Sequence, residues 1–111
     1  MIDLDGCTMF VSNTDAAGVV GAETRLHFRQ RGDRVWARYA GGDVARGWLV
    51  GRLTGRTLRF RYAQTENGAV HGGASVCDVE RLAGGRRRII EHFAWSTRPG
   101  SGVNVFDEVV V

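Results

Sequence analysis

The sequence predicts an all-β protein, an eight-stranded antiparallel barrel with up-and-down topology. Helical periodicity is nearly absent from the 111 residues, and short runs that alternate apolar and polar residues recur about every ten residues between glycine-rich turns. An even number of strands lets the last apolar run, VNVFDEVVV, pair with the first strand. Closing the sheet in this way removes the exposed edges that an open sheet would offer for aggregation.

The eight strands follow the alternating runs in order. We expect them at about residues 6–13, 22–30, 34–40, 44–53, 57–65, 69–82, 86–97 and 102–111. Most connections are short, which makes successive strands antiparallel neighbours, and only 13–22 is longer. One domain therefore spans residues 1–111, a length that buries a modest core without disulfides.

The dipeptide Asn67-Gly68 is the strongest hairpin signal in the chain, because a two-residue type I′ turn favours this pair. The register that follows is Gln64 opposite His71, Tyr62 opposite Gly73, and Phe60 opposite Ser75. Keeping Arg59 and Arg61 in water sends the partners in this register inward.

A three-residue turn at 83–85 extends the register to the next strand. It places Cys77 opposite Glu91, Ser75 opposite Phe93, and Gly73 opposite Trp95, all facing inward. On the second strand, the same alternation places Thr24, Leu26, Phe28 and Gln30 inside. The interior is therefore aromatic with a few polar groups.

The stretch RVWARYAGGDVARGWLVG (34–51) forms a hairpin whose register depends on its turn. A three-residue turn at 41–43 keeps the arginines in water and pairs Trp36 with Trp48 on the outside; it places Val35, Ala37, Tyr39, Ala45, Gly47 and Leu49 inside. A two-residue Gly-Gly turn would instead bring Arg46 and Trp48 inside, beside Tyr39, to form an anion-binding pocket. We favour the first register, in which Trp36, Trp48 and Val50 form an outer apolar patch and a homodimer or homotetramer seam.

Composition narrows the function classes. All 15 basic residues are arginine, set against 12 acidic residues, and the sequence pI is about 9.5. Apart from the run 86–88, the arginines are scattered through the strands. This scattering argues against nucleic-acid binding. The N-terminal residues show neither a signal peptide nor an apolar membrane span, so we expect a cytoplasmic protein.

Metal and cofactor motifs are absent from the sequence. Cys7 and Cys77 lie far apart with no Cys/His cluster, which predicts two reduced thiols and neither a disulfide nor a zinc site. We expect no cofactor and no bound metal.

Glu91 is the most informative inward residue, because a carboxyl group among apolar side chains must be paired, solvated or protonated. We expect a hydrogen bond to Gln64, His71 or a buried water. Gly47, Gly51 and Gly73, if inward, leave space that the aromatic side chains need not fill.

The stretch GAETRLHFRQRGDRVWARYAGGDVARGWLVG, with VSNTDAAG before it and HFAWST after it, resembles a family of short bacterial proteins often labelled N-acetylglutamate synthase. These proteins are regarded as barrels of the avidin and streptavidin (calycin) type. An acetyltransferase would need an α/β fold with a pyrophosphate-binding loop before a helix, and the sequence shows neither.

The resemblance implies a ligand site in one barrel mouth, between aromatic walls and small polar groups. By position it would include Ser12, Asn13, Tyr39, Ser75, Cys77 and either Phe93 or Trp95, with a carboxylate of the last strand at Asp107 or Glu108. The short lid at 41–43, and Tyr62 in place of a tryptophan, argue against biotin itself as the ligand. Together with the register, this gives one expected ligand-binding set: Asn13, Tyr39, Phe60, Tyr62, Gln64, His71, Ser75, Glu91, Phe93 and Trp95.

Three functions fit this sequence. The first is a small-molecule binding protein that holds a partly apolar ligand at the end bounded by 13–22, 41–43, 65–69 and 97–102. The second is a cofactor-independent cyclase or isomerase, in which Glu91, Tyr39 or Tyr62 supplies one acid, base or hydrogen bond. The third is a structural barrel with a filled interior. Fold analogy alone cannot choose among them.

Overall fold

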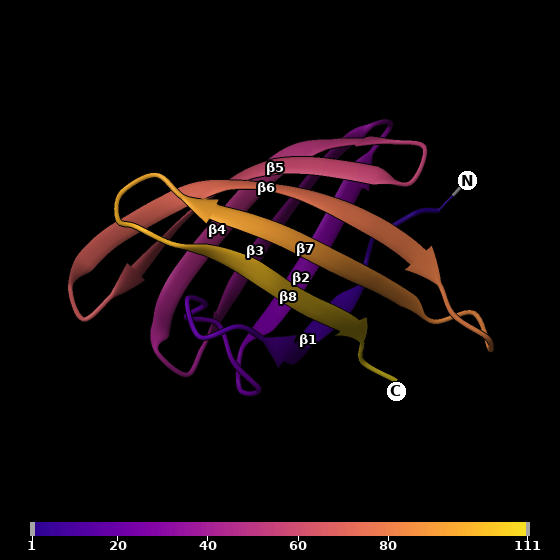
Figure 1. Ribbon diagram of the computed structural model, residues 1–111. Coiled ribbons are helices and arrows are strands. Elements are labelled where there is room, and N and C mark those ends of the chain that lie inside the picture. Colours follow the sequence, from indigo (N-terminus) through magenta and orange to yellow (C-terminus); the bar gives the residue numbers. More distant parts are fainter. Residues whose placement is uncertain (1, 111) are drawn as a thin grey trace.

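The computed structural model describes residues 2–110, which form eight β-strands (Figure 1). Met1 and Val111 lie outside this range. The expected domain includes both residues, and the expected final strand includes Val111. The strands are β1 (Thr8–Thr14), β2 (Arg25–Arg31), β3 (Arg34–Gly41), β4 (Val44–Thr54), β5 (Thr57–Glu66), β6 (Ala69–Arg81), β7 (Arg87–Trp95) and β8 (Ser101–Glu108). The predicted all-β architecture is confirmed.

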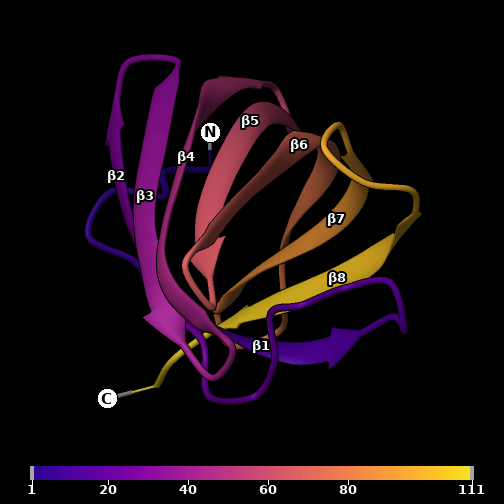
Figure 2. The same ribbon diagram turned by 90° about the vertical axis from the view of Figure 1, so that its left-hand side faces the viewer.

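The strands close into a barrel in simple sequence order, every neighbouring pair being antiparallel. Figure 2 shows β1 lying between β2 and β8, which completes the ring, and β2 to β4 forming the wall opposite β7 and β8. Pairing of β1 with β8 joins Met9 to Glu108 and Thr14 to Asn104, with a bulge between Val11 and Asn13. The up-and-down topology expected from the short connections is therefore correct.

The two registers derived from the turns on either side of β6 are also correct. Asn67 and Gly68 both have positive φ, 48° and 79°, as a type I′ turn requires. All six expected pairs are present, from Gln64 opposite His71 to Gly73 opposite Trp95. The side chains on the second strand also face as expected, because Thr24, Leu26 and Phe28 are buried and Gln30 is half-buried.

The hairpin of β3 and β4 differs from the expected register. The chain turns through Gly42 and Asp43, so that Gly41 pairs with Val44, and a β-bulge follows in which Ala45 and Arg46 oppose Ala40 alone. Trp36 consequently pairs with Val50, and Trp48 with Arg38, which corrects the expected Trp36–Trp48 pair.

The inward and outward sides of this hairpin are nevertheless mostly as expected. The register beyond the bulge is shifted by two residues, and an even shift keeps each side chain on the same face of the sheet. Gly47 and Leu49 are buried, and Trp36, Trp48 and Val50 are exposed by 38%, 49% and 63%. Ala45 is exposed, and Val44 takes the expected inward place. Arg46 is exposed as well, so the alternative register with an inward arginine is wrong.

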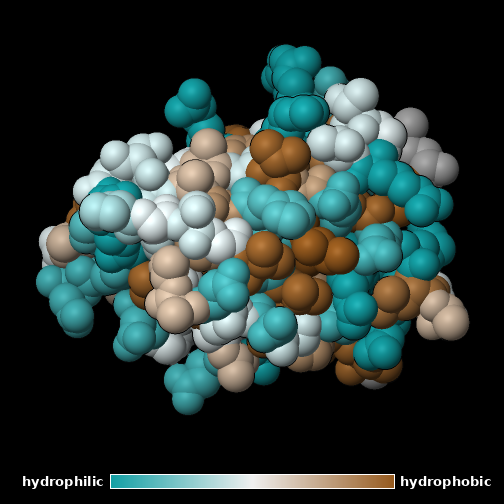
Figure 3. Space-filling view, viewed as in Figure 1, coloured by the Kyte–Doolittle hydropathy of each residue, from teal (hydrophilic) through white to brown (hydrophobic). Residues whose placement is uncertain are grey.

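The apolar core fills the barrel from one end to the other. The largest fully buried side chains are Phe28, Phe106, Leu4, Met9 and Leu26. Outside, the face formed by β6, β7 and β8 carries hydrophobic atoms gathered between hydrophilic ones (Figure 3). On these strands Val76 is exposed and Ile90, Val103 and Val105 are half-buried, and Ile90 is the cross-strand partner of Val105. Across residues 2–110, no helix has the length and apolar character needed to cross a membrane.

Candidate functional site

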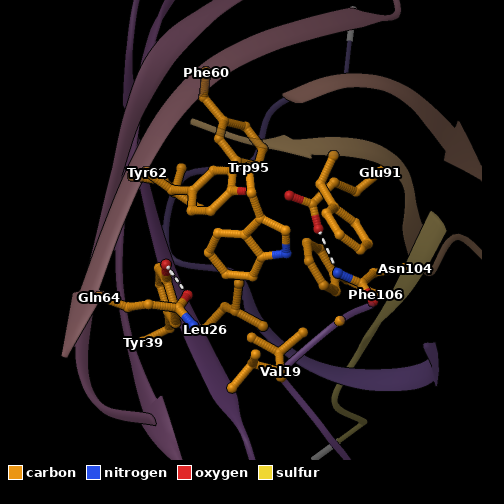
Figure 4. A pocket seen from close by; sticks show the side chains of 14 residues that line it. Val19, Leu26, Tyr39, Phe60, Tyr62, Gln64, Glu91, Trp95, Asn104 and Phe106 are labelled. Carbon is orange, nitrogen blue, oxygen red and sulfur yellow. Dashed lines mark hydrogen bonds between the residues drawn. The ribbon is translucent and has the colours of Figure 1, made fainter. Parts of the chain in front are cut away.

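The candidate site is a small cavity inside the barrel, near the end that the chain segment between β1 and β2 covers (Figure 4). Seven members of the expected ligand-binding set line it: Tyr39, Phe60, Tyr62, Gln64, Glu91, Phe93 and Trp95. Six strands and the covering segment contribute to its lining. Its volume, counted as the space open to the centres of water molecules, is about 20 Å³. That space holds about one water molecule, so the site as it stands is nearly filled.

Several of the aromatic side chains that line this cavity have a glycine as their cross-strand partner. The cross-strand pairs are Tyr39 with Gly47, Phe60 with Gly51, Tyr62 with Gly73, and Phe93 with Gly102. A Cβ atom at Gly73 would lie 2.6 Å from Tyr62 Oη, and one at Gly102 would lie 3.0 Å from Phe93 Cζ. Gly47, Gly73 and Gly102 therefore make room for the Tyr39, Tyr62 and Phe93 rings, whereas a Cβ atom at Gly51 would meet the backbone of Arg59 and Phe60. The expectation that Gly47, Gly51 and Gly73 leave free space is wrong.

The rings also contact one another at steep angles. The Tyr62 and Trp95 centroids lie 5.3 Å apart with an interplanar angle of 74°, and those of Phe93 and Trp95 lie 6.0 Å apart at 70°. Edge-to-face contacts of this kind are favourable beyond the apolar area that they bury. Trp95 is thus held between two walls of the cavity.

Glu91 lies at the polar side of the cavity and is 95% buried, with an exposed fraction of 5%. Ser75 Oγ donates a hydrogen bond to Glu91 Oε2 at 2.6 Å, and Asn104 Nδ2 donates one to Glu91 Oε1 at 2.9 Å. Thr14 Oγ1 donates to Asn104 Oδ1 at 2.5 Å, which orients the amide nitrogen of Asn104 toward the carboxyl group. Two of the three partners expected from the sequence are wrong, because the side chains of Gln64 and His71 form hydrogen bonds with Glu66 and Thr97 instead.

Burial raises the pKa of Glu91, and the two hydrogen bonds from Ser75 and Asn104 oppose this rise in part. Burial also raises the pKa values of the Tyr39 and Tyr62 hydroxyl groups, and the nearby Glu91 adds to the shift. Both tyrosines therefore keep their protons and act as hydrogen-bond donors. Tyr39 Oη donates to Gln64 Oε1 at 2.8 Å, and Tyr62 Oη donates to the Ala94 carbonyl oxygen at 3.3 Å.

A chain of polar contacts runs from the cavity wall to the barrel mouth. Gln64 Nε2 donates to Glu66 Oε2 at 2.8 Å, and both terminal nitrogens of Arg98 bind the Glu66 carboxylate at 2.7 and 3.0 Å. This arginine holds the pKa of Glu66 below its usual value, with a smaller effect from Gln64. The Arg98 guanidinium carbon lies 3.8 Å from the centroid of the Trp95 ring, a cation–π contact.

Trp95 closes the mouth of the cavity against the segment between β1 and β2. Its indole Nε1 donates to the Ala17 carbonyl oxygen at 2.9 Å, and Val19 and Val20 of the same segment line the cavity. In Figure 4, Trp95 stands at the centre of the site with Val19 below it. We call Trp95 and residues 17–20 the mouth plug.

Three residues of the expected ligand-binding set do not line the cavity. Asn13 is exposed on β1. His71 lies half-buried at the rim, where its Nδ1 is 2.9 Å from Thr97 Oγ1 and its ring centroid is 6.4 Å from that of Trp95. Ser75 reaches the site only through Glu91.

Positions implied by the resemblance alone fall mostly outside the cavity. Ser12 is exposed and donates to the Val105 carbonyl oxygen. Asp107 and Glu108 pair with Arg88 and Arg87, each at 2.7 Å, and lie away from the cavity. The arginine run 86–88 is therefore largely ion-paired. Cys77 is buried beside Glu91 in the register, and burial raises the pKa of its thiol.

Sequence reasoning missed Asn104, which is the inward polar residue of β8, and the segment 18–20. Asn104 pairs with Glu91 across β7 and β8. The connection between these strands, residues 96–100, has no two-residue turn motif, so the register could not be carried across it. The covering segment lacks alternation because it is not a strand. Within residues 2–110, no three His, Cys, Asp or Glu side chains lie close enough together to hold a metal ion.

Comparisons with known proteins agree with the closed meander and its aromatic interior. The model of a family described as avidin-like protein matches residues 2–109, which is nearly the whole chain. Searches of curated proteins and of solved structures found no match. The match supports a small-molecule-binding barrel and self-association at a general level, without a specific ligand or oligomer. The resemblance inferred from the residues is confirmed, and the chain belongs to the avidin-like protein family.

Proposed function

We propose that this protein binds a small, partly apolar molecule in the cavity behind the mouth plug. The observation that carries the proposal is an aromatic lining, in which the Tyr39, Tyr62 and Phe93 rings lie against cross-strand glycines, around the polar group of Glu91, Ser75 and Asn104. An apolar wall with a few convergent polar groups is the usual chemistry of a small-molecule site. The general character of the family supports the same function.

Binding requires the mouth plug to move. Small-molecule pockets have volumes of about 300–1,000 Å³, whereas this cavity has about 20 Å³. Trp95 is half-buried, and it is tied to the covering segment by one hydrogen bond to Ala17. Swinging the indole outward and lifting residues 17–20 would open the space that the ring now fills.

The chemistry of the lining favours a neutral ligand over an anion. Glu91 is the one ionisable acid among the lining residues, and no arginine or histidine lines the cavity in the part of the chain that the structure describes. Burial raises the pKa of Glu91, so its neutral form persists to higher pH than that of an exposed glutamate. A polar group on the ligand would form a hydrogen bond with this carboxyl group or with the Asn104 amide.

Native mass spectrometry of the protein isolated from its own host tests the proposal. We expect a bound mass that is released on unfolding and that is lost from Val19→Phe, because Val19 lines the mouth and a ring there would block it. Val70→Phe is the matched control, since Val70 is 65% exposed and does not line the cavity. Retention of the bound mass by Val19→Phe would place the ligand elsewhere.

Buried Glu91 supports a second candidate, a cyclase or isomerase, because a carboxyl group with a raised pKa can act as a general acid near neutral pH. Tyr39 and Tyr62 would then donate hydrogen bonds to the folded substrate. The two candidates are separated by incubating the released compound with fresh protein and comparing its chromatographic retention before and after. An enzyme changes the compound and Glu91→Gln slows the change, whereas a binding protein returns the compound intact. Absence of any bound mass would favour the third candidate, a structural barrel with a filled interior.

The oligomer predicted from the sequence is a homodimer or homotetramer held through Trp36, Trp48 and Val50. All three side chains are exposed on β3 and β4, where Trp36 and Val50 are cross-strand partners. This seam stays a prediction, and the same native spectra report the number of subunits.

A further inference from the structure

The outer wall formed by β2 to β5 gathers most of the positive charge of the chain. Residues 25–66, which span β2 to β5, contain ten of the 15 arginines and three of the 12 acidic residues, Asp33, Asp43 and Glu66. All ten arginines are exposed, whereas Asp33 and Asp43 lie in turns and Glu66 is half-buried and paired with Arg98. Alternation along the strands sends nine of the arginines to the outer side of the sheet, and Arg56 lies in the turn between β4 and β5. Charges that are scattered along the sequence therefore form one basic surface in the fold.

The strand registers arrange this surface in rows. One row runs His27, Arg38, Trp48 and Ala63; the next runs Arg29, Trp36, Val50 and Arg61; the third runs Arg31, Arg34, Arg52 and Arg59. Two rows thus interleave tryptophan with arginine, and the third consists of arginine alone.

The third row is unfavourable for the isolated protein. Like charges directly opposite each other destabilise a sheet. Of its four arginines, only Arg52 has an ion-pair partner within residues 2–110, namely Asp33 at 3.3 Å. In the second row, Arg29 pairs with Asp5 at 3.0 Å and Arg61 has no carboxylate partner in the same range. The surface therefore lacks the counter-charges that would satisfy it within one chain.

Two adjoining hollows lie on this surface, with volumes of about 450 and 550 Å³. His27, Arg38 and Trp48 line both hollows, so the two are continuous. Trp36 and Arg29 lie in the first hollow, and Arg25 and Arg46 in the second. No acidic side chain lines either one among the described residues.

We propose that the outer face of β2 to β5 binds single-stranded nucleic acid. Exposed aromatic rings stack on unpaired bases, and arginines bind phosphate groups with paired hydrogen bonds. Trp36 and Trp48 supply two rings on adjacent strands, and Arg38 lies opposite Trp48 in the sheet. The site is separate from the cavity and does not depend on the proposed small-molecule function. In the sequence the arginines are scattered, which argued against nucleic-acid binding. In the fold the strand registers bring them together on one face.

Charge favours this occupant over a second copy of the chain, which the predicted oligomer seam would place on the same face. A two-fold contact through Trp36 and Trp48 would bring two arginine-rich faces together. In the row Arg31, Arg34, Arg52 and Arg59, only Arg52 has an ion-pair partner within residues 2–110, and a second copy would add further arginines. A polyanion neutralises these charges, whereas self-association concentrates them.

Fluorescence anisotropy with a fluorescein-labelled twelve-nucleotide oligo-dT tests the proposal. We expect binding at about 50 mM salt that weakens steeply as salt is raised, because phosphate contacts release counterions. Trp48→Ala should weaken binding about tenfold through lost stacking, and Trp48→Phe should restore most of it. Arg38→Gln should reduce the slope of log affinity against log salt by about 0.7, the value for one phosphate contact on a single strand.

Arg86→Gln is the matched control, because Arg86 is an exposed arginine in the turn between β6 and β7, outside the basic face. It should leave both affinity and slope unchanged. Circular dichroism spectra of all variants confirm folding before binding is measured. A labelled oligo-U and a labelled duplex of the same length complete the set: the single strands should bind comparably and the duplex more weakly.

Several results would overturn the proposal. One is that oligo-dT does not bind at about 50 mM salt, and another is that the duplex binds more tightly than the single strands. A third is that wild type and Trp48→Ala bind oligo-dT equally well and that inorganic polyphosphate competes fully. The last result would mean charge attraction without base stacking. A concentration-dependent dimer that Trp48→Ala dissociates, with no oligo-dT binding, would assign the face to a second copy of the chain.

Discussion

At the scale of single residues, Glu91 shows how burial and hydrogen bonding set the state of one group. Its carboxyl group is buried among aromatic rings, which raises its pKa above the usual 4.5, while Ser75 and Asn104 hold its two oxygens. Wherever the folded state binds a proton more tightly than the unfolded state, stability falls as pH rises. Glu91 therefore contributes most at low pH, and its contribution declines from about pH 4.5 up to its raised pKa.

This sign gives a first prediction. The free energy of unfolding of wild type minus that of Glu91→Gln should decrease as pH rises through this window, and should be constant above the raised pKa. Urea unfolding at a series of pH values from about 4 to about 8 measures the difference. Asp78→Asn, which changes an exposed carboxylate on the outer face, should show no such trend. A flat difference for Glu91→Gln would mean that folding leaves the pKa of the carboxyl group unchanged.

Gly47 gives a second prediction at the same scale. An added Cβ atom would collide with the Tyr39 ring and with little else, so Gly47→Ala should destabilise the protein by about 1–3 kcal/mol through overpacking. In the double variant Gly47→Ala/Tyr39→Ala, the collision is gone. The destabilisation of the double variant should therefore be smaller than the sum of the destabilisations of the two single variants. Gly21→Ala is the control, since a Cβ atom there meets nothing within 4 Å. Additive costs would show that the ring does not rest on the glycine.

At the scale of elements, the turns decide what the sequence can predict. The turn at Asn67-Gly68 requires two residues with positive φ, and this pair accepts that conformation readily, so the β5–β6 register was predictable. The turn at 41–43 offers two glycines and an aspartate, which allow several turn types. The chain uses a two-residue turn and a bulge there, a combination that alternation does not reveal. Asn104 was missed for the same reason, since no turn motif fixes the register between β7 and β8.

The mouth plug gives a third prediction, at the scale of this loop and strand end. Trp95→Phe keeps an aromatic ring but removes the indole donor to the Ala17 carbonyl oxygen, a contact worth about 1 kcal/mol. Amide hydrogen exchange at residues 16–20 should become several-fold faster, while exchange in β5 and β6 should not change. Thr97→Val, at the neighbouring rim, serves as the control. Unchanged exchange in residues 16–20 would mean that the plug is held by packing alone.

At the scale of the whole molecule, the sequence predicted the barrel and most of the aromatic lining, because both follow from two-residue alternation along strands. It did not predict how full the interior is. The Tyr39, Tyr62 and Phe93 rings lie against cross-strand glycines, and Trp95 occupies space beside Tyr62, so the cavity depends on packing across several strand pairs. The basic face was missed for a related reason: its charges come from four strands and meet only when their registers are known.

That face gives a last prediction, because repulsion within it must lower the stability of the isolated barrel. Arg34 lies opposite both Arg31 and Arg52. Arg34→Gln should therefore raise the free energy of unfolding by about 0.5 kcal/mol at low salt, and the gain should shrink as salt screens the charges. Thermal and urea unfolding at about 20 mM and about 300 mM sodium chloride measure both effects. Arg86→Gln removes the same charge outside the basic face and should not stabilise the protein. If Arg34→Gln were destabilising at low salt, the arginine stem would contribute more through packing than its charge costs through repulsion.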